Sequence, residues 1–216
     1  MCEDAMKPFD PSLYFITDST NLTEDVFLRR VEQALEGGVT LLQLREKERS
    51  TREYMELAEK VHQLTQRYQV PLIIDDRVDV ALAVDAEGVH VGASDLPVAV
   101  ARKLMGPHKI IGATAKTVPW AKEAWEQGAD YLGVGAIYPT TTKVRTVLTS
   151  TDTLREICAA VPIPVNAIGG LNKDNIHVLA GIPIAGICVV SAIMKADDPT
   201  LAARELKERA RELKIL

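Results

Sequence analysis

The chain has 216 residues, of which 47% are hydrophobic and 25% charged, and its formal net charge is -5 at pH 7. A chain of this size can bury a full core without disulfides or a structural metal. The negative charge disfavours a general attraction to nucleic acid or to anionic membranes.

Three further features narrow the class of protein. No apolar run approaches the roughly 20 residues that a membrane-spanning helix needs. The three cysteines, Cys2, Cys158 and Cys188, have neither the spacing of a zinc site nor an even number for disulfide pairing. The N-terminal residues lack the basic and apolar regions of a secretory signal, so we expect a cytoplasmic protein.

Apolar runs and helical patterns alternate along the chain. The apolar runs suit strands that are buried on both faces, and the predicted strands are 13–18, 40–46, 71–76, 88–92, 109–115, 131–137, 164–170 and 186–193. An amphipathic pattern follows each of them, and the predicted helices are 24–36, 51–68, 78–84, 98–105, 118–127, 152–160, 172–180 and 199–213.

No linker or change in composition divides this series of βα units. Eight such units in a chain of 216 residues predict an α/β fold, a single-domain (βα)8 TIM barrel over residues 1–216, with 1–12 as an N-terminal extension. A doubly wound open sheet is the alternative, because periodicity does not show whether the sheet closes.

The C-terminal ends of the strands carry function in such a barrel, and the second strand ends in polar residues. Gln43, Arg45 and Lys47 alternate, so their side chains point to the same side of the strand. A basic pair in this place suits an oxyanion such as phosphate. A solvated run of charges is the alternative interpretation.

Carboxylates follow the third and fourth strands. Asp75 and Asp76 end one apolar run, and Asp95 comes shortly after the next. Neighbouring strands would bring Asp76 and Asp95 within reach of one Mg²⁺ ion, which commonly takes one or two carboxylates together with phosphate oxygens. For Asp95 the alternative is a helix N-cap ahead of Pro97.

Hydroxyls and glycines follow the later strands. Thr140, Thr142 and Lys143 begin a polar loop that reaches Ser150, and such groups can surround a diphosphate. The Thr141–Ser150 segment is a candidate lid, with a plain flexible loop as the alternative. Gly169, Gly170 and the pair Val190–Ser191 suit a phosphate site on the backbone, although an ordinary turn would also use two glycines.

With these residues assembled, the chain resembles the thiamine phosphate synthase family over nearly its whole length. The resemblance rests on eight segments in order, YFITD, QLREK, DDR, GVHVG, SDLP, GAIYPTTTK, AIGG and VVSAI. It implies a (βα)8 barrel that joins 4-amino-2-methyl-5-hydroxymethylpyrimidine diphosphate to 4-methyl-5-(2-phosphoethyl)thiazole. The products are thiamine phosphate and diphosphate, and the reaction uses magnesium.

The resemblance also implies roles for individual residues. Gln43 would contact the pyrimidine, and Asp76 and Asp95 would bind Mg²⁺. Thr140 and Thr142 would lie near the thiazole. The thiazole phosphate would rest on the backbone of Gly170, Val190 and Ser191. The catalytic candidates are Arg45, Lys47 and Lys143, which would hold the diphosphate, and Thr114.

Two positions depart from the family pattern. Asp75 replaces an asparagine that would contact the diphosphate, and the fifth strand ends in Gly112-Ala113-Thr114-Ala115-Lys116 where the family has a serine and a histidine. Asp75 and Thr114 remain candidates for substrate binding. An added carboxylate should repel a diphosphate unless a cation offsets it. We hypothesise that Lys116 supplies that charge.

Two rival functions remain open on the sequence. One is a thiazole tautomerase, a related isomerase that uses a histidine where this chain has Lys116. The other is a non-catalytic relative that binds thiamine phosphates. We expect phosphorylated small molecules as partners, with no nucleic acid and no membrane, and a homo-oligomer stays open. His90 is expected to be a hydrogen-bonded core histidine.

Overall fold

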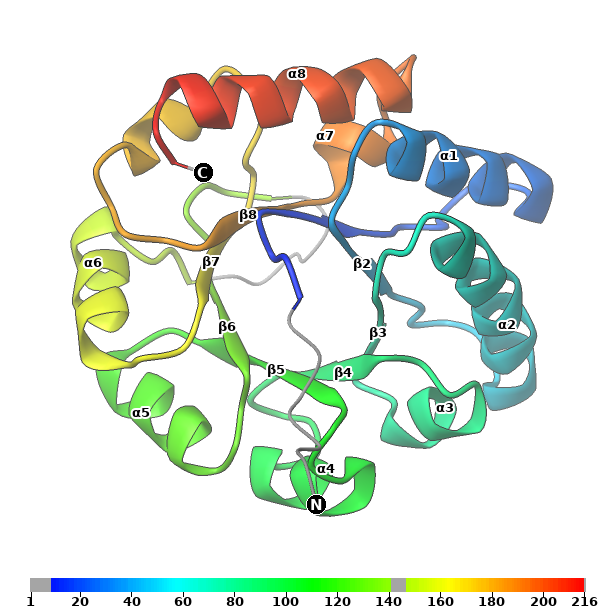
Figure 1. Cartoon of the computed structure of the whole chain (residues 1–216), viewed down its shortest axis with the longest axis horizontal. Coiled ribbons are helices and arrows are strands. Elements are labelled where there is room, and N and C mark those ends of the chain that lie inside the picture. Colours follow the sequence, from blue (N-terminus) through cyan, green and yellow to red (C-terminus); the bar gives the residue numbers. More distant parts are fainter. Residues whose placement is uncertain (1–8, 141–146, 216) are drawn as a thin grey trace, which may run out of the picture.

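A computed structural model describes residues 9–140 and 147–215 (Figure 1). All neighbouring strands are parallel and pair in chain order, and β8 pairs with β1, so the sheet is closed. The barrel prediction is therefore confirmed and the open sheet is excluded. The strands are β1 (Leu13–Ile16), β2 (Leu41–Leu44), β3 (Leu72–Asp75), β4 (Gly88–Val91), β5 (Ile110–Ala115), β6 (Tyr131–Gly135), β7 (Val165–Ile168) and β8 (Gly186–Val189).

Helices surround this ring of strands on its outside, as Figure 1 shows. They are α1 (Glu24–Glu36), α2 (Thr51–Arg67), α3 (Val78–Ala83), α4 (Val98–Met105), α5 (Val118–Glu126), α6 (Thr151–Ala160), the 3₁₀ helix η1 (Ile176–Leu179), α7 (Ser191–Met194) and α8 (Pro199–Glu212). That the whole of 1–216 is one domain stays a prediction, because residues 1–8 lie outside the described part.

Several predicted strands end two residues earlier in the structure, and two predicted elements differ more strongly. The helix expected over 172–180 is only the single turn η1, because the Asn172 side chain accepts the backbone N–H groups of Asp174 and Asn175 at 2.9 and 3.2 Å. Such a local turn competes with a helix. The strand expected over 186–193 ends at Val189, and the apolar run continues as α7.

The side chains of the strands divide between two apolar clusters. One lies between the strands and the helices, and the smaller one fills the inside of the barrel, with Tyr14, Leu41, Ile73, Ile110 and Tyr131 among its members. This division follows from the alternation of side chains along each strand. At the entry of the chain, Phe9 packs edge-on against Tyr131, with 5.7 Å between the ring centroids.

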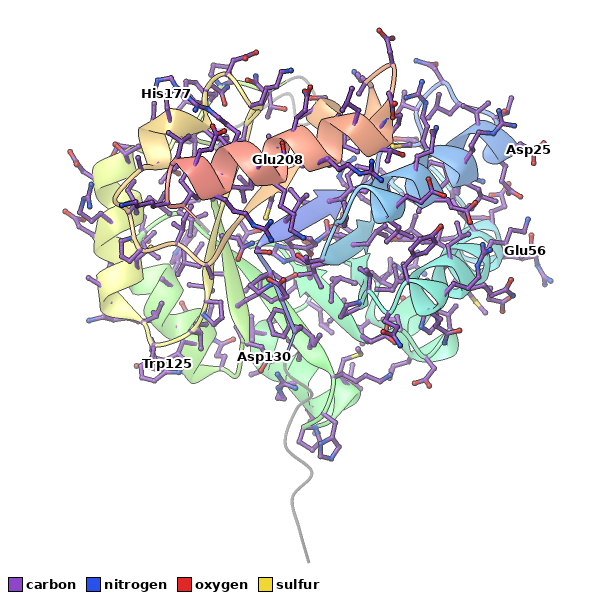
Figure 2. All side chains as sticks on the ribbon, turned by 45° about the horizontal axis from the view of Figure 1, so that its top comes forward. Asp25, Glu56, Trp125, Asp130, His177 and Glu208 are labelled. Atoms are coloured by element: carbon purple, nitrogen blue, oxygen red, sulfur yellow. The ribbon has the colours of Figure 1, made fainter. Side chains whose placement is uncertain are left out.

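The outer faces of the helices carry many charged side chains, although Trp120 and Trp125 on α5 are exposed as well. Asp25 and Glu56 lie at the periphery in Figure 2, and Glu208 lies on the outer side of α8. Among the described residues, no helix combines the length and the apolar character that crossing a bilayer requires.

Gly112 on β5 makes room for two large polar side chains inside the barrel. A Cβ atom there would lie 2.1 Å from Tyr131 Cζ and 2.5 Å from His90 Nδ1. Gly133 on β6 is different, since its Cβ would meet only His90, with Cε1 the nearer atom at 3.4 Å. Glycine is therefore required at 112 by the packing of Tyr131 and His90, and not at 133.

Gly112→Ala should lower the free energy of unfolding by about 1–3 kcal/mol, because the added methyl overpacks the barrel interior. Gly133→Ala is the matched control and should cost clearly less. Urea unfolding of the two variants checks this. Equal stability of the two would contradict the packing described here.

Candidate active site

A cavity of ≈ 370 Å³ opens where the strands end at their carboxyl side. Every strand contributes at least one residue to its wall, from Tyr14 on β1 to Val189 on β8. The closed parallel sheet produces this arrangement, because it brings all of the carboxyl ends to one mouth. The cavity is therefore the natural place for binding and chemistry.

The cavity collects most of the residues that the sequence singled out. The predicted site residues that line it are Gln43, Arg45, Lys47, Asp75, Asp76, Asp95, Thr114, Thr140, Gly170, Val190 and Ser191. Thr142 and Lys143 lie outside the described residues, as does the first part of the candidate lid, 141–146. Near the end of the candidate lid, Thr149 donates its backbone N–H to Ala136 O at 2.8 Å.

Lys47 lies between two carboxylates at the mouth. Its Nζ is 2.7 Å from Asp75 Oδ2 and also contacts Asp76 Oδ2, and Arg45 Nε lies 3.8 Å from Asp75 Oδ2. Burial alone would lower the pKa of Lys47, but Asp75 and Asp76 outweigh it and raise that pKa above its ordinary value. The ammonium group therefore stays charged and offsets the two carboxylates beside it.

Asp76 and Asp95 form the second charged feature. Asp95 Oδ2 accepts the backbone N–H of Gly92 at 2.8 Å. Burial raises the pKa of Asp95, and a hydrogen bond between its carboxyl and that of Asp76 raises it further. Two carboxyl groups in contact present oxygens to the same point, so this pair fits a divalent cation.

The described residues contain no group of three or more His, Cys, Asp or Glu side chains arranged to hold a metal. The pair would therefore need further oxygens from a ligand, which agrees with the preference of Mg²⁺ for carboxylates plus phosphate. The N-cap residue of α4 is Pro97, so Asp95 does not cap that helix and the alternative interpretation of Asp95 was wrong.

The backbone at the end of β7 is shaped by two glycines. Gly169 and Gly170 have φ of 105° and 63°, in the left-handed region that glycine adopts without strain. A Cβ atom on Gly170 would lie 2.7 Å from Pro139 O. Gly170 lines the cavity together with Val190 and Ser191, so the backbone of this wall can approach a ligand closely.

Tyr14 and His90 line the cavity but were not among the predicted site residues, and neither was Tyr131, which is fully buried beside them. Tyr14, Tyr131 and His90 lie inside the barrel, and His90 Nδ1 and Nε2 lie 3.1 and 3.0 Å from Tyr131 Oη and Thr114 Oγ1. His90 is hydrogen-bonded, as expected, but it also lines the cavity. The signal that could have identified it is an imidazole inside the apolar run of the fourth predicted strand, and the structure places it opposite Asp75 in the β3–β4 register.

Lys116 lines the cavity as well, but among the described residues Asp75 forms its ion pairs with Arg45 and Lys47. Within that part of the chain, the cation nearest to Asp75 is thus Lys47 on the β2 side, and not the Lys116 of our hypothesis. Asp75 is 7% exposed, so its charge acts on the cavity with little screening by water.

The chain is similar to known proteins of one family over most of its length. The family model of thiamine monophosphate synthase matches residues 13–193. The chain is 55% identical to thiamine-phosphate synthase 2 of Streptococcus pneumoniae serotype 4 over 186 residues, which is 86% of this chain and 89% of that protein. It is 56% identical to thiamine-phosphate synthase of Enterococcus faecalis over 188 residues, 87% of this chain and 89% of the other.

A solved structure gives the same result for the fold. The thiamine phosphate pyrophosphorylase of Pyrococcus furiosus superposes with a TM-score of 0.85 at 43% sequence identity. The match covers 94% of this chain and 97% of the other.

Asp75→Asn should tighten the binding of inorganic diphosphate roughly fivefold, because it removes a carboxylate that holds Lys47 while keeping the shape of the side chain; the half-exposed lysine limits the gain to about 1 kcal/mol. Calorimetry without divalent metal measures this. Asp79→Asn, which removes the exposed partner of Arg77 outside the cavity, is the control. Weaker binding by Asp75→Asn would contradict the repulsion.

Proposed function

The chain belongs to the thiamine monophosphate synthase family and is an enzyme that forms thiamine phosphate, and we propose that the cavity at the strand ends is where it does so. The observation that carries the proposal is the meeting of Arg45 and Lys47 with the Asp76–Asp95 pair around one cavity. This is the set of groups that a magnesium diphosphate requires. The substrates would be the pyrimidine diphosphate and the thiazole phosphate.

Arg45 and Lys47 would hold the diphosphate of the pyrimidine substrate. In the free protein Lys47 pairs with Asp75 and Asp76. We propose that on binding its ammonium group turns from Asp76 to the phosphate oxygens, which leaves Asp76 available to a metal. Lys143 and Thr142 remain proposed members of this site from the family resemblance alone.

Asp76 and Asp95 would hold Mg²⁺ as the cofactor. Bound there, the ion would neutralise charge on the diphosphate and so make it a better leaving group. The buried position of Asp95 and its contact with Gly92 N–H keep that carboxyl directed at Asp76. The pair therefore orients the ligand oxygens before the reaction begins.

The chemistry needs no nucleophilic side chain. The C–O bond to the diphosphate breaks, and the aminopyrimidine ring stabilises the carbon cation that forms. The thiazole nitrogen then attacks that carbon, so one bond is exchanged for another and diphosphate leaves. The protein's part is to hold the two rings together and to place Arg45 and Lys47 where negative charge develops.

The other walls would position the two rings. Gln43 and Thr114 would contact the pyrimidine, with Asp75 beside them. Thr140 would lie near the thiazole. The phosphate of the thiazole would rest on the backbone at Gly170, Val190 and Ser191, where the left-handed glycine allows close approach. Each of these residues lines the cavity.

Neither rival function is favoured by a specific observation. The tautomerase would use a histidine where this chain has Lys116, and a purely binding relative would not need the charged groups to converge as they do. We further propose that the enzyme is cytoplasmic and that its partners are small phosphorylated molecules. A homo-oligomer remains open to measurement by light scattering.

Diphosphate release should require both substrates and a divalent cation, and it should fall at least 100-fold in Asp76→Ala, since one carboxylate cannot hold the ion. Removal of metal with EDTA should abolish activity and added Mg²⁺ should restore it. Asp79→Ala, outside the cavity, should keep normal activity. Full activity after metal removal would contradict the magnesium proposal, and no release by the unaltered enzyme would contradict the function itself.

A further inference from the structure

A chain of hydrogen bonds crosses the floor of the cavity and joins side chains from five strands. Gln43 Nε2 donates to Tyr14 Oη at 2.7 Å, and the hydroxyl oxygens of Tyr14 and Tyr131 are 2.7 Å apart. Tyr131 Oη is 3.1 Å from His90 Nδ1, and His90 Nε2 is 3.0 Å from Thr114 Oγ1. We call these residues the polar chain. Its two ends, Gln43 and Thr114, both line the cavity.

The direction of one hydrogen bond in the polar chain fixes the direction of the others. A hydroxyl can accept two hydrogen bonds but has one proton, and a buried proton needs an acceptor. Tyr14 Oη accepts from Gln43 Nε2 and has Tyr131 Oη as its other hydrogen-bond partner, so Tyr14 donates to Tyr131 and Tyr131 donates to His90 Nδ1. A neutral imidazole with an accepting Nδ1 carries its proton on Nε2 and donates to Thr114. Burial raises the pKa of both tyrosines well above the ordinary value, so both remain neutral donors.

The ends of the polar chain therefore offer a ligand opposite hydrogen-bonding groups. Gln43 uses Nε2 for Tyr14, which leaves the carbonyl Oε1 on the other arm of the amide as an acceptor. Thr114 accepts from His90, so its own proton is free to point elsewhere. If every hydrogen bond of the polar chain ran the other way, Gln43 would offer a ligand an amide donor and Thr114 would offer it a hydroxyl acceptor.

The barrel keeps the polar chain in place by packing. Tyr14, Tyr131 and Gln43 are at most 2% exposed. The missing side chain of Gly112 is the space in which Tyr131 meets His90. Phe9 and Tyr14 both pack edge-on against the Tyr131 ring, with ring centroids 5.7 Å from its own. The direction of the hydrogen bonds is thus held by rigid groups rather than by water.

We propose that Tyr14, Tyr131 and His90 are positioning residues that fix this direction, and that the enzyme thereby selects a 4-aminopyrimidine over its 4-oxo counterpart. The inference rests on the proposed function of Gln43 and Thr114 at the pyrimidine. An aminopyrimidine donates from its amino group and accepts at its ring nitrogens, which complements Gln43 Oε1 and the Thr114 hydroxyl. The 4-oxo ring has an acceptor in place of the amino donor, so it faces Gln43 Oε1 acceptor to acceptor.

Tyr131→Phe tests the proposal, because it removes the central hydroxyl of the polar chain and little else. The KM for the pyrimidine diphosphate should rise roughly tenfold, the value of one mispaired hydrogen bond, while the KM for the thiazole phosphate stays unchanged. The preference is the inhibition constant of the 4-oxo pyrimidine diphosphate divided by the KM of the amino substrate. This ratio should shrink by a similar factor.

Tyr54→Phe is the matched control. Tyr54 is also buried but does not line the cavity. Among the described residues, its hydroxyl donates to the backbone alone, to Leu44 O at 2.7 Å and to Asp75 O at 3.4 Å, and touches no side chain of the polar chain. It should lose stability without a change in either KM or in the preference. If Tyr131→Phe behaves like Tyr54→Phe while the unaltered enzyme is active, the positioning role is wrong and the proposed function stands. An inactive unaltered enzyme would instead overturn the function.

A second measurement uses the unaltered protein, so it tests the proposal even if the Tyr131→Phe variant does not fold. The ¹⁵N spectrum of the unaltered protein distinguishes the two neutral forms of a histidine, and His90 is identified by variants that replace His62, His108 and His177 with Gln. A proton on His90 Nε2 is the expected result, with and without bound pyrimidine diphosphate. A proton on Nδ1 in the bound enzyme would show the reversed direction and overturn the proposal.

Discussion

The pairing of β8 with β1 is the constraint on which the rest of the structure depends. Once a parallel sheet closes, all of its carboxyl ends lie at one mouth, and alternate side chains must point into a small interior. Residues as distant in the chain as Gln43 and Ser191 then share one cavity. The same closure leaves little space inside, which is why Gly112 faces Tyr131 and His90.

The mouth of the barrel is organised by ion pairs, and its interior is organised by hydrogen bonds. At the mouth, Arg45 and Lys47 offset the charges of Asp75 and Asp76 before any ligand arrives, and these ion pairs can be exchanged when one does. Inside, the polar groups are buried, so each donor and acceptor needs a partner within the protein, as Tyr14 and Tyr131 have in each other. Charge would thus bind the diphosphate, and hydrogen-bond direction would recognise the ring that carries it.

Much of this organisation could be predicted from the sequence. The apolar runs predicted the strands, and the polar residues that follow them predicted the site. Core packing gives no reason for Asp76 and Arg45 to follow a buried strand, so their presence there indicated a function. The partner of Asp75 could not be predicted, since Lys47 and Lys116 are equally plausible until the register is known. The predicted end of the last strand was wrong because the sequence stays mostly apolar from Val190 into α7. Tyr14 and Tyr131 were missed because a buried tyrosine cannot be told from an ordinary core residue by its sequence context.

The central claim is that Asp76 and Asp95 hold a metal which, with Arg45 and Lys47, holds a diphosphate. A crystal structure of the protein with Mn²⁺ and diphosphate, using the anomalous signal of manganese, tests it most directly. The account predicts a single manganese peak between the two carboxylates, with diphosphate oxygens completing its coordination and Lys47 moved onto the phosphate. Manganese elsewhere, or Lys47 still against Asp76 with diphosphate bound, would contradict it.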